Sequence, residues 1–199
     1  MKAFLVLISI LLLISIFIFT PLDRDYYKEA LYYQKMKKQL DSIPPYKNSK
    51  GLLKVGWGKS NITPRLPVSI ASYGLRDNFD DVHDSIWCRA FVFDNGHSKS
   101  ALVTVDLLIF PPAVVRKLKD KLPEVGFSLE NTFLSASHTH NGAGGWAEGL
   151  GGRVLAGKYS EEYVNQITDA VLTSIQSAFN DMEAASLGFG KYEAKKIYF

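Results

Sequence analysis

Two histidines, His138 and His140, are the residues of this chain best suited to do chemistry. They are two of only four histidines in 199 residues, and they lie between an apolar segment and a glycine-rich loop. On an extended backbone, residues i and i+2 point to the same side, so both imidazoles can face one point. Imidazole is a common transition-metal ligand and a proton carrier near neutral pH. The spacing therefore predicts half of a metal site, beside a loop that lets a substrate approach the backbone closely.

A β-hairpin is predicted upstream of the two histidines. Residues 86–94 and 100–107 are rich in β-branched, aromatic and aliphatic side chains, and they flank the dipeptide Asn95-Gly96, which favours a tight turn. Residues 101–105 are almost wholly apolar, which is expected of a central strand covered on both faces. A shorter strand is predicted at residues 53–57.

The segments that follow the hairpin alternate between helix and strand. Residues 112–122 carry apolar side chains at helical spacing, and residues 132–137 form an apolar strand pattern. Strand, helix and strand at this spacing predict a βαβ unit with parallel neighbouring strands. The segment 160–182 is predicted as a second helix capped by its first serine, and a last strand is predicted from about 185 toward 199. The predicted fold is therefore α/β, with a mixed β-sheet, a βαβ unit and flanking helices.

Polar residues collect at one edge of this predicted sheet. Asp106 ends one parallel strand and His138 follows the other, so we expect the two side chains to face each other where open α/β sheets bind ligands. The hairpin places residue 106 opposite about residue 86, which brings His83 and Asp84 to the same edge. Two plainer interpretations stay open: Asp106 caps a loop or the next helix, and His83 and Asp84 form a solvated loop pair.

Composition excludes several classes of function. The net charge of +3 is small, and no stripe of Lys and Arg alternates with aromatic residues, so nucleic-acid binding is not expected. Cys88 is the only cysteine, which excludes an intrachain disulfide and a thiolate metal cluster. Because Cys88 lies inside an apolar strand pattern, we expect a small core residue and not a nucleophile.

The N-terminus carries an uncharged apolar run from residue 3 to residue 19, interrupted by Ser9 and Ser15. As a helix, this run would be roughly 25 Å long, against about 30 Å for the apolar core of a bilayer. That length suits a signal-peptide core or a short anchor. No small-x-small cleavage pattern follows at Thr20 to Asp23, which favours an uncleaved signal anchor.

The chain divides into three predicted parts. Residues 1–22 form the signal anchor or signal peptide, residues 23–51 form a helical stalk and a linker, and residues 52–199 form a globular domain. This domain is expected to be incomplete at its C-terminus, because the chain stops in a strand-like run. The basic residues lie mainly after the apolar run, which by the positive-inside rule alone would place the globular part in the cytoplasm.

Four segments resemble one protein family in composition and order. They are residues 54–64 (KVGWGKSNITP), 82–84 (VHD), 103–108 (VTVDLL) and 134–142 (LSASHTHNG), of which the His-Thr-His core is the most specific. In this order they resemble the N-terminal catalytic domain of neutral, non-lysosomal ceramidases. The resemblance extends over residues 53–193.

The resemblance implies a zinc site. In the family, zinc assists the hydrolysis of the amide bond of N-acylsphingosine; His138 is implied as a zinc ligand and His140 as a catalytic residue beside the metal and the substrate. The family's other ligands (a further His, a Glu and a Tyr) and its candidate nucleophilic serine are expected beyond Phe199, unless His83 or Asp106 completes the shell. Candidates for second-shell or substrate contacts are His83, Asp84, Asp106, Asn141 and Gly142.

The predicted function is that of a zinc-dependent amidohydrolase of the neutral ceramidase type, acting on ceramide-like lipids in sphingolipid metabolism. The resemblance favours export, so we expect a membrane-anchored protein whose globular part is periplasmic or extracellular. The chain alone is not expected to be a complete enzyme. Two alternatives stay open: a non-catalytic, membrane-tethered binding module of the same fold, and a related hydrolase with a different amide or ester substrate.

Overall fold

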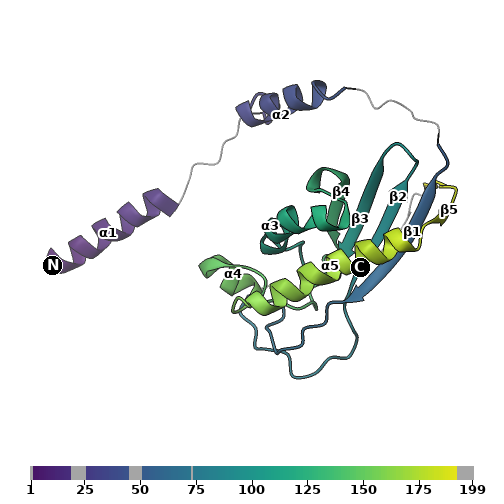
Figure 1. Ribbon diagram of the computed structural model, residues 1–199. Helices are drawn as coiled ribbons and strands as arrows, with labels where there is room; N and C mark the ends of the chain where they lie inside the picture. Colours follow the sequence, from purple (N-terminus) through teal and green to yellow (C-terminus); the bar gives the residue numbers. More distant parts are fainter. Residues whose placement is uncertain (1, 19–25, 45–50, 73, 192–199) are drawn as a thin grey trace. The chain divides into compact units, whose positions relative to one another are not determined.

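The computed structural model describes residues 2–18, 26–44, 51–72 and 74–191 (Figure 1). The chain forms two compact units, residues 1–48 and residues 49–199. Each unit is described by itself below.

The first unit contains two helices, α1 (Lys2–Ile18) and α2 (Leu31–Asp41). Helix α2 buries no side chain, and Lys37 pairs with Asp41 one turn later at 3.0 Å. The predicted stalk helix is therefore present from Leu31 onward. Among the residues that the structure describes, no helix combines the length and the apolar character needed to cross a membrane. The predicted anchor helix is thus not supported.

The second unit is built on a five-stranded sheet in the order β4-β3-β2-β1-β5 (Figure 1). Neighbouring strands are antiparallel except β3 and β4, which are parallel and confirm the predicted βαβ unit and mixed sheet. The predicted last strand is wrong for residues 185–191, and residues 192–199 lie outside the described part of the chain. The strands are β1 (Lys54–Asn61), β2 (Trp87–Asp94), β3 (Lys99–Val105), β4 (Thr132–Ala136) and β5 (Glu183–Ala184).

The register of the β2–β3 hairpin differs by one residue from the prediction. Cys88 pairs with Val105, so Asp106 lies opposite Trp87 and not opposite residue 86. The difference arises because the loop between β2 and β3 is longer than a two-residue turn. Within this loop, Asn95 Oδ1 accepts hydrogen bonds from the backbone N–H groups of His97 and Ser98.

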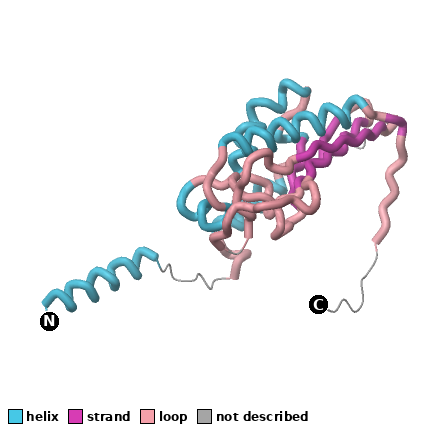
Figure 2. The backbone as a smooth tube through the Cα atoms, turned by 90° about the horizontal axis from the view of Figure 1, so that it is seen from below, coloured by secondary structure: helices cyan, strands magenta, loops and turns pink. Residues whose placement is uncertain are grey.

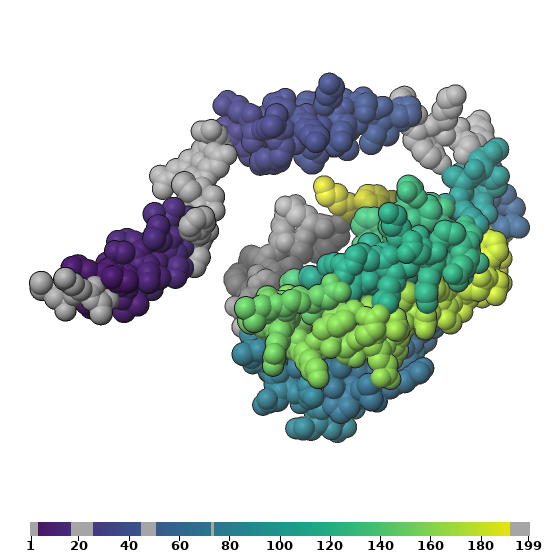
Figure 3. All heavy atoms as spheres, turned by 60° about the vertical axis from the view of Figure 1, so that its left-hand side comes forward, coloured from purple at the N-terminus to yellow at the C-terminus, as the bar shows by residue number. Residues whose placement is uncertain are grey.

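One long helix covers the sheet. Helix α5 packs along β1 and β2, and it begins where Ser160 Oγ accepts a hydrogen bond from Tyr163 N at 3.2 Å, as predicted. The approach of α5 to β1 is close, because a Cβ atom at Gly58 would lie 2.4 Å from the carbonyl oxygen of Ser174. Spheres of α4 and α5 form a continuous surface in Figure 3. The helical elements are α3 (Pro112–Lys121), η1 (Leu122–Val125), η2 (Leu129–Asn131), α4 (Gly149–Ala156) and α5 (Glu161–Asn180).

Within the described residues of the second unit, the helices of that unit cover one face of the sheet (Figure 2). On the other face, four directly paired residues form an apolar row across β1, β2, β3 and β4: Trp57, Phe91, Leu102 and Phe133. Leu102 is 40% exposed and Phe133 is 67% exposed. Within the described residues of the second unit, the prediction that β3 is covered on both faces is therefore wrong.

Candidate active site

The loop from His138 to Gly142 follows β4 after a single residue, Ser137. Ser137 N still donates to Val105 O at 3.0 Å, but His138 has a φ of 60°, in the left-handed region. The extended backbone that we expected through His138 is therefore wrong. The two imidazoles are nevertheless neighbours, with ring centroids 5.1 Å apart and ring planes at 89°. The left-handed turn brings them together in an edge-to-face arrangement.

One hydrogen bond defines the orientation of the exposed His138 ring. Its Nδ1 atom lies 2.7 Å from the carbonyl oxygen of Leu108, in the segment that follows β3. Because a carbonyl oxygen can only accept, Nδ1 carries the proton, and in the neutral ring the lone pair of Nε2 is available to a ligand. Metal-binding histidines commonly donate their second ring N–H to such a carbonyl.

His138 and His140 line the same cavity, which has a volume of about 500 Å³. His140 is partly buried, and its Nδ1 atom is inaccessible to solvent. The cavity wall is largely apolar, with Leu108 and Ile109 from the segment after β3 and further residues from α4. Two imidazoles therefore face a space that suits an apolar molecule. The sequence did not predict α4, which contributes Gly151, Val154 and Leu155 to this cavity.

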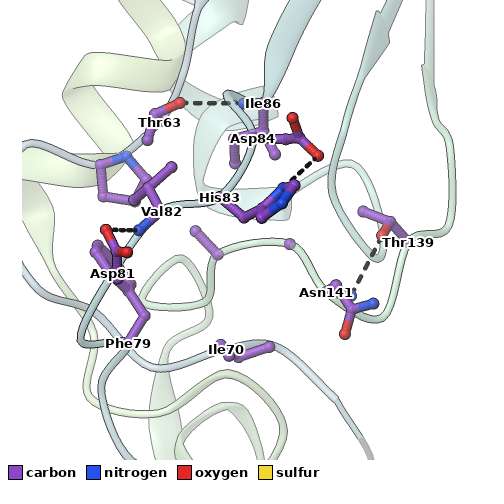
Figure 4. A pocket seen from close by; sticks show the side chains of 13 residues that line it. Thr63, Ile70, Phe79, Asp81, Val82, His83, Asp84, Ile86, Thr139 and Asn141 are labelled. Carbon is purple, nitrogen blue, oxygen red and sulfur yellow. Dashed lines mark hydrogen bonds and ion pairs between the residues drawn. The ribbon is translucent and has the colours of Figure 1, made fainter.

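Other residues of the same loop line a second cavity of about 480 Å³ (Figure 4). Thr139, Asn141 and Gly142 contribute to it, together with His83 and Asp84. The loop therefore separates two cavities, with the histidines on one side and the residues between and after them on the other.

The pair His83–Asp84 is a solvated loop pair, the plainer of the two interpretations. His83 Nδ1 lies 2.9 Å from Asp84 Oδ2, and the side chains are 97% and 90% exposed (Figure 4). Neither residue lines the cavity of His138 and His140. The predicted gathering of all these residues at one site is wrong, because the loop lies between them.

The carboxylate of Asp106 is hydrogen-bonded and ion-paired to residues of β2. Its Oδ2 atom accepts a hydrogen bond from Trp87 N at 3.0 Å, and Arg89 Nη1 lies 2.9 and 2.8 Å from its two carboxylate oxygens. The side chain of Asp106 is 22% exposed. We expected Asp106 to face His138, but its carboxylate is engaged by the neighbouring strand. Sequence reasoning missed Arg89, although an arginine inside an otherwise apolar strand was a signal for such a partner.

Comparison with known proteins identifies the family. Residues 53–197 match the family model described as neutral/alkaline non-lysosomal ceramidase, N-terminal. The chain belongs to this family. The neutral ceramidase of Pseudomonas aeruginosa is 30% identical over 148 residues, which cover 70% of this chain and 22% of that protein. The neutral ceramidase of Mycobacterium tuberculosis is 26% identical over 152 residues, which cover 71% of this chain and 24% of that protein.

Solved ceramidase structures share the fold. A structure described as ceramidase complexed with C2 has a TM-score of 0.57 and 26% sequence identity, covering 67% of this chain and 22% of that chain. The crystal structure of neutral ceramidase from Pseudomonas aeruginosa has a TM-score of 0.55 and 24% identity, covering 68% and 23%. The chain therefore spans less than a quarter of the length of these ceramidases, and the predicted family resemblance is confirmed.

The residues of this ceramidase-family chain fit part of a zinc shell. A catalytic zinc site takes three protein ligands and one open position. His138 is exposed and carries its proton on Nδ1, which leaves Nε2 able to bind a metal, and the ring of His140 lies beside it. Within the described ranges, however, no group of three or more His, Cys, Asp or Glu side chains could hold a metal ion. His83 and Asp106 therefore do not complete a shell with the two histidines.

Cys88 takes no part in the site. Its side chain is fully buried, and burial raises the pKa of the thiol to about 12. The thiolate needed for nucleophilic attack or metal binding is therefore strongly disfavoured at neutral pH. The prediction that Cys88 is a core residue is confirmed.

Gly142 has a structural reason to be glycine. A Cβ atom at this position would lie 2.9 Å from the carbonyl oxygen of Asp106 and 3.4 Å from Leu107 Cα. The backbone of the loop therefore rests directly on the segment that follows β3. Whether Gly142 also touches a substrate stays a prediction.

Proposed function

We propose that this chain carries part of the active site of a zinc-dependent amidohydrolase that cleaves the N-acyl amide bond of ceramide-like lipids. The single observation that carries the proposal is the hydrogen bond from His138 Nδ1 to Leu108 O, which leaves Nε2 available beside an apolar cavity. Membership of the ceramidase family and the names of the relatives support the substrate class.

Each histidine has a proposed role. His138 would hold the zinc ion through Nε2, while His140, whose ring is 5.1 Å away, would move protons at the reacting amide. When bound, zinc polarises a carbonyl and lowers the pKa of coordinated water to about 7. The apolar wall formed by Leu108, Ile109 and α4 would accept hydrocarbon of the lipid and exclude water.

The proposal includes a location outside the cytoplasm. The described side chains of α1 are uncharged and mostly exposed, with Ile16 at 71% and Leu12 at 60% exposure. Such a segment would direct export or hold the chain at a membrane that contains its lipid substrate. A fusion of alkaline phosphatase to the C-terminus tests this, because that enzyme is active only after export. An inactive but intact fusion contradicts the proposed location.

A second candidate is a non-catalytic binding module of the same fold. One observation brings it in: within the described residues, no third His, Cys, Asp or Glu side chain joins His138 and His140 in a metal-binding group. A related hydrolase that acts on a different amide or ester is distinguished from both by its substrate.

Zinc binding and hydrolysis separate these candidates. We would titrate zinc into the purified chain and assay fluorescent N-acylsphingosine and a matched ester, comparing wild type with His138→Ala. The matched control is His97→Ala, because His97 is an exposed residue in the β2–β3 loop. We expect His138→Ala to weaken zinc binding at least tenfold and the control to leave it unchanged. Equal zinc affinity in all three proteins contradicts the proposal. Hydrolysis of either substrate excludes the binding module, whereas its absence separates nothing, because the chain alone is not expected to be a complete enzyme.

A further inference from the structure

Asp106 extends the β2–β3 ladder by one residue beyond Val105. Its backbone N–H donates to Trp87 O at 2.9 Å, and its carboxylate accepts from Trp87 N at 3.0 Å. The guanidinium of Arg89 contacts both carboxylate oxygens through Nη1, at 2.9 and 2.8 Å. Four contacts therefore hold this one residue to β2, at the point where β3 ends and the chain turns away.

The segment from Asp106 to Leu108 supports both ends of the histidine loop. At the first end, Leu108 O receives the Nδ1 proton of His138 at 2.7 Å. At the second end, Gly142 packs so closely on Asp106 O that a Cβ atom would lie 2.9 Å from it. Leu107 is fully buried and Leu108 is 5% exposed, so this segment is held by the core as well. Because Asp106 and Leu108 are only two residues apart, a displacement of Asp106 would also shift the carbonyl that accepts the His138 proton, to the extent that the core contacts yield.

We propose that Asp106 is the positioning residue for His138. By holding the start of the 106–108 segment against β2, its carboxylate keeps Leu108 O within reach of Nδ1 and so selects the ring tautomer in which Nε2 carries the lone pair. The partner of one ring nitrogen decides the state of the other. The use of that lone pair for zinc rests on the proposed function, but the selection of the tautomer operates in the metal-free chain.

The alternative is that Asp106 only stabilises the end of a strand. Both roles predict some loss of stability on substitution, so stability cannot separate them. Only the positioning role predicts a change at the imidazole of His138, which the carboxylate of Asp106 does not touch in any hydrogen bond described above. The test therefore measures the protonation of the two ring nitrogens of His138 directly.

The decisive variant is Asp106→Asn, in which an NH₂ group replaces one of the two acceptor oxygens and would face the guanidinium of Arg89. The matched control is Asp94→Asn, at the opposite end of the same hairpin, where Asp94 Oδ1 accepts from Gly96 N at 2.7 Å. Nitrogen-15 NMR of the histidine rings in the metal-free chain, at a pH where they are neutral, reports the tautomer. We expect a single His138 tautomer with the proton on Nδ1 in wild type and control, and a mixture in Asp106→Asn.

Zinc titration gives the second measurement. Loss of a residue that orients a ligand typically weakens metal binding about 10–100-fold. We expect a loss of that size in Asp106→Asn and less than about twofold in the control. An unchanged tautomer in folded Asp106→Asn overturns the inference, whatever the zinc affinity. A changed tautomer in a chain that binds no zinc supports the inference and contradicts the proposed function, so the two failures are distinguishable.

A milder variant covers the case in which Asp106→Asn does not fold. Arg89→Gln removes the guanidinium but leaves both hydrogen bonds between Asp106 and Trp87. We expect a smaller change of the His138 tautomer in the same direction. No change in this folded variant overturns the inference.

Discussion

The left-handed backbone at His138 predicts that glycine at this position gives a more stable protein than alanine. A non-glycine residue at a φ of 60° costs about 1–2 kcal/mol, which alanine retains and glycine relieves. Both substitutions lose the bond from Nδ1 to Leu108 O, so this loss cancels in the comparison. Glycine gains about 0.4–1 kcal/mol of extra unfolded-state entropy, which opposes its advantage. The expected net difference is about 0.5–1 kcal/mol in favour of His138→Gly.

Urea unfolding of the metal-free chain, followed by far-ultraviolet circular dichroism, measures this difference. A gain of that size also raises the melting temperature by about 1–4 °C in a protein of this length. The control pair is His97→Gly and His97→Ala, because His138 is the one non-glycine residue with positive φ among those described. At His97 the order should reverse, since glycine there only adds unfolded-state entropy. If glycine is no better than alanine at position 138, or if both positions give the same order, the inferred backbone strain is refuted. Both His138 variants should lose zinc binding.

Three other predictions test the packing of α5 on β1, the N-cap of α5 and the burial of Cys88. Gly58→Ala should lower the free energy of unfolding by about 1–3 kcal/mol, measured in urea, because its Cβ would lie 2.4 Å from Ser174 O; an unchanged midpoint contradicts the close packing of α5 on β1. Ser160→Ala should cost about 1 kcal/mol through loss of the bond from Tyr163 N, and a melting temperature equal to wild type would exclude a capping role. Burial raises the pKa of Cys88 from 9.0 to about 12, so the folded state retains its thiol proton where the unfolded state loses it. The free energy of unfolding should therefore fall as the pH rises from about 9 to about 12, by at most about 1.4 kcal/mol per pH unit from this group, and the fall should be smaller in Cys88→Ala. Fast labelling of the native thiol at pH 8 would contradict its burial.

Much of the fold could be predicted because its signals are local. The Asn95-Gly96 step marks the hairpin, and apolar spacing with a capping serine marks α5. Helix α4 could not be predicted, because Gly149, Gly151 and Gly152 disfavour helix formation. One of these glycines is required by a local contact, because a Cβ at Gly152 would lie 2.7 Å from the carbonyl carbon of Ala147, five residues earlier.

The candidate site was predicted only in part, and its backbone geometry differs from the predicted one. The two imidazoles are neighbours, but through a left-handed turn at His138 that a residue pattern does not reveal. The acceptor of the His138 proton is the carbonyl of Leu108, a group that every residue has, so no side-chain signal marks it. The placement of His83 on the far side of the loop depends on how the long 63–86 connection folds back, which is likewise a tertiary property.

The separation of two cavities by one short loop has a consequence for redesign. His138 and His140 supply the chemistry on one side, whereas Thr139 and Asn141 face the other side and carry no donor to the first cavity. A library limited to positions 139 and 141 would therefore change the lining of the second cavity while keeping both imidazoles in the first. The second cavity can therefore be redesigned at Thr139 and Asn141 without replacing either histidine.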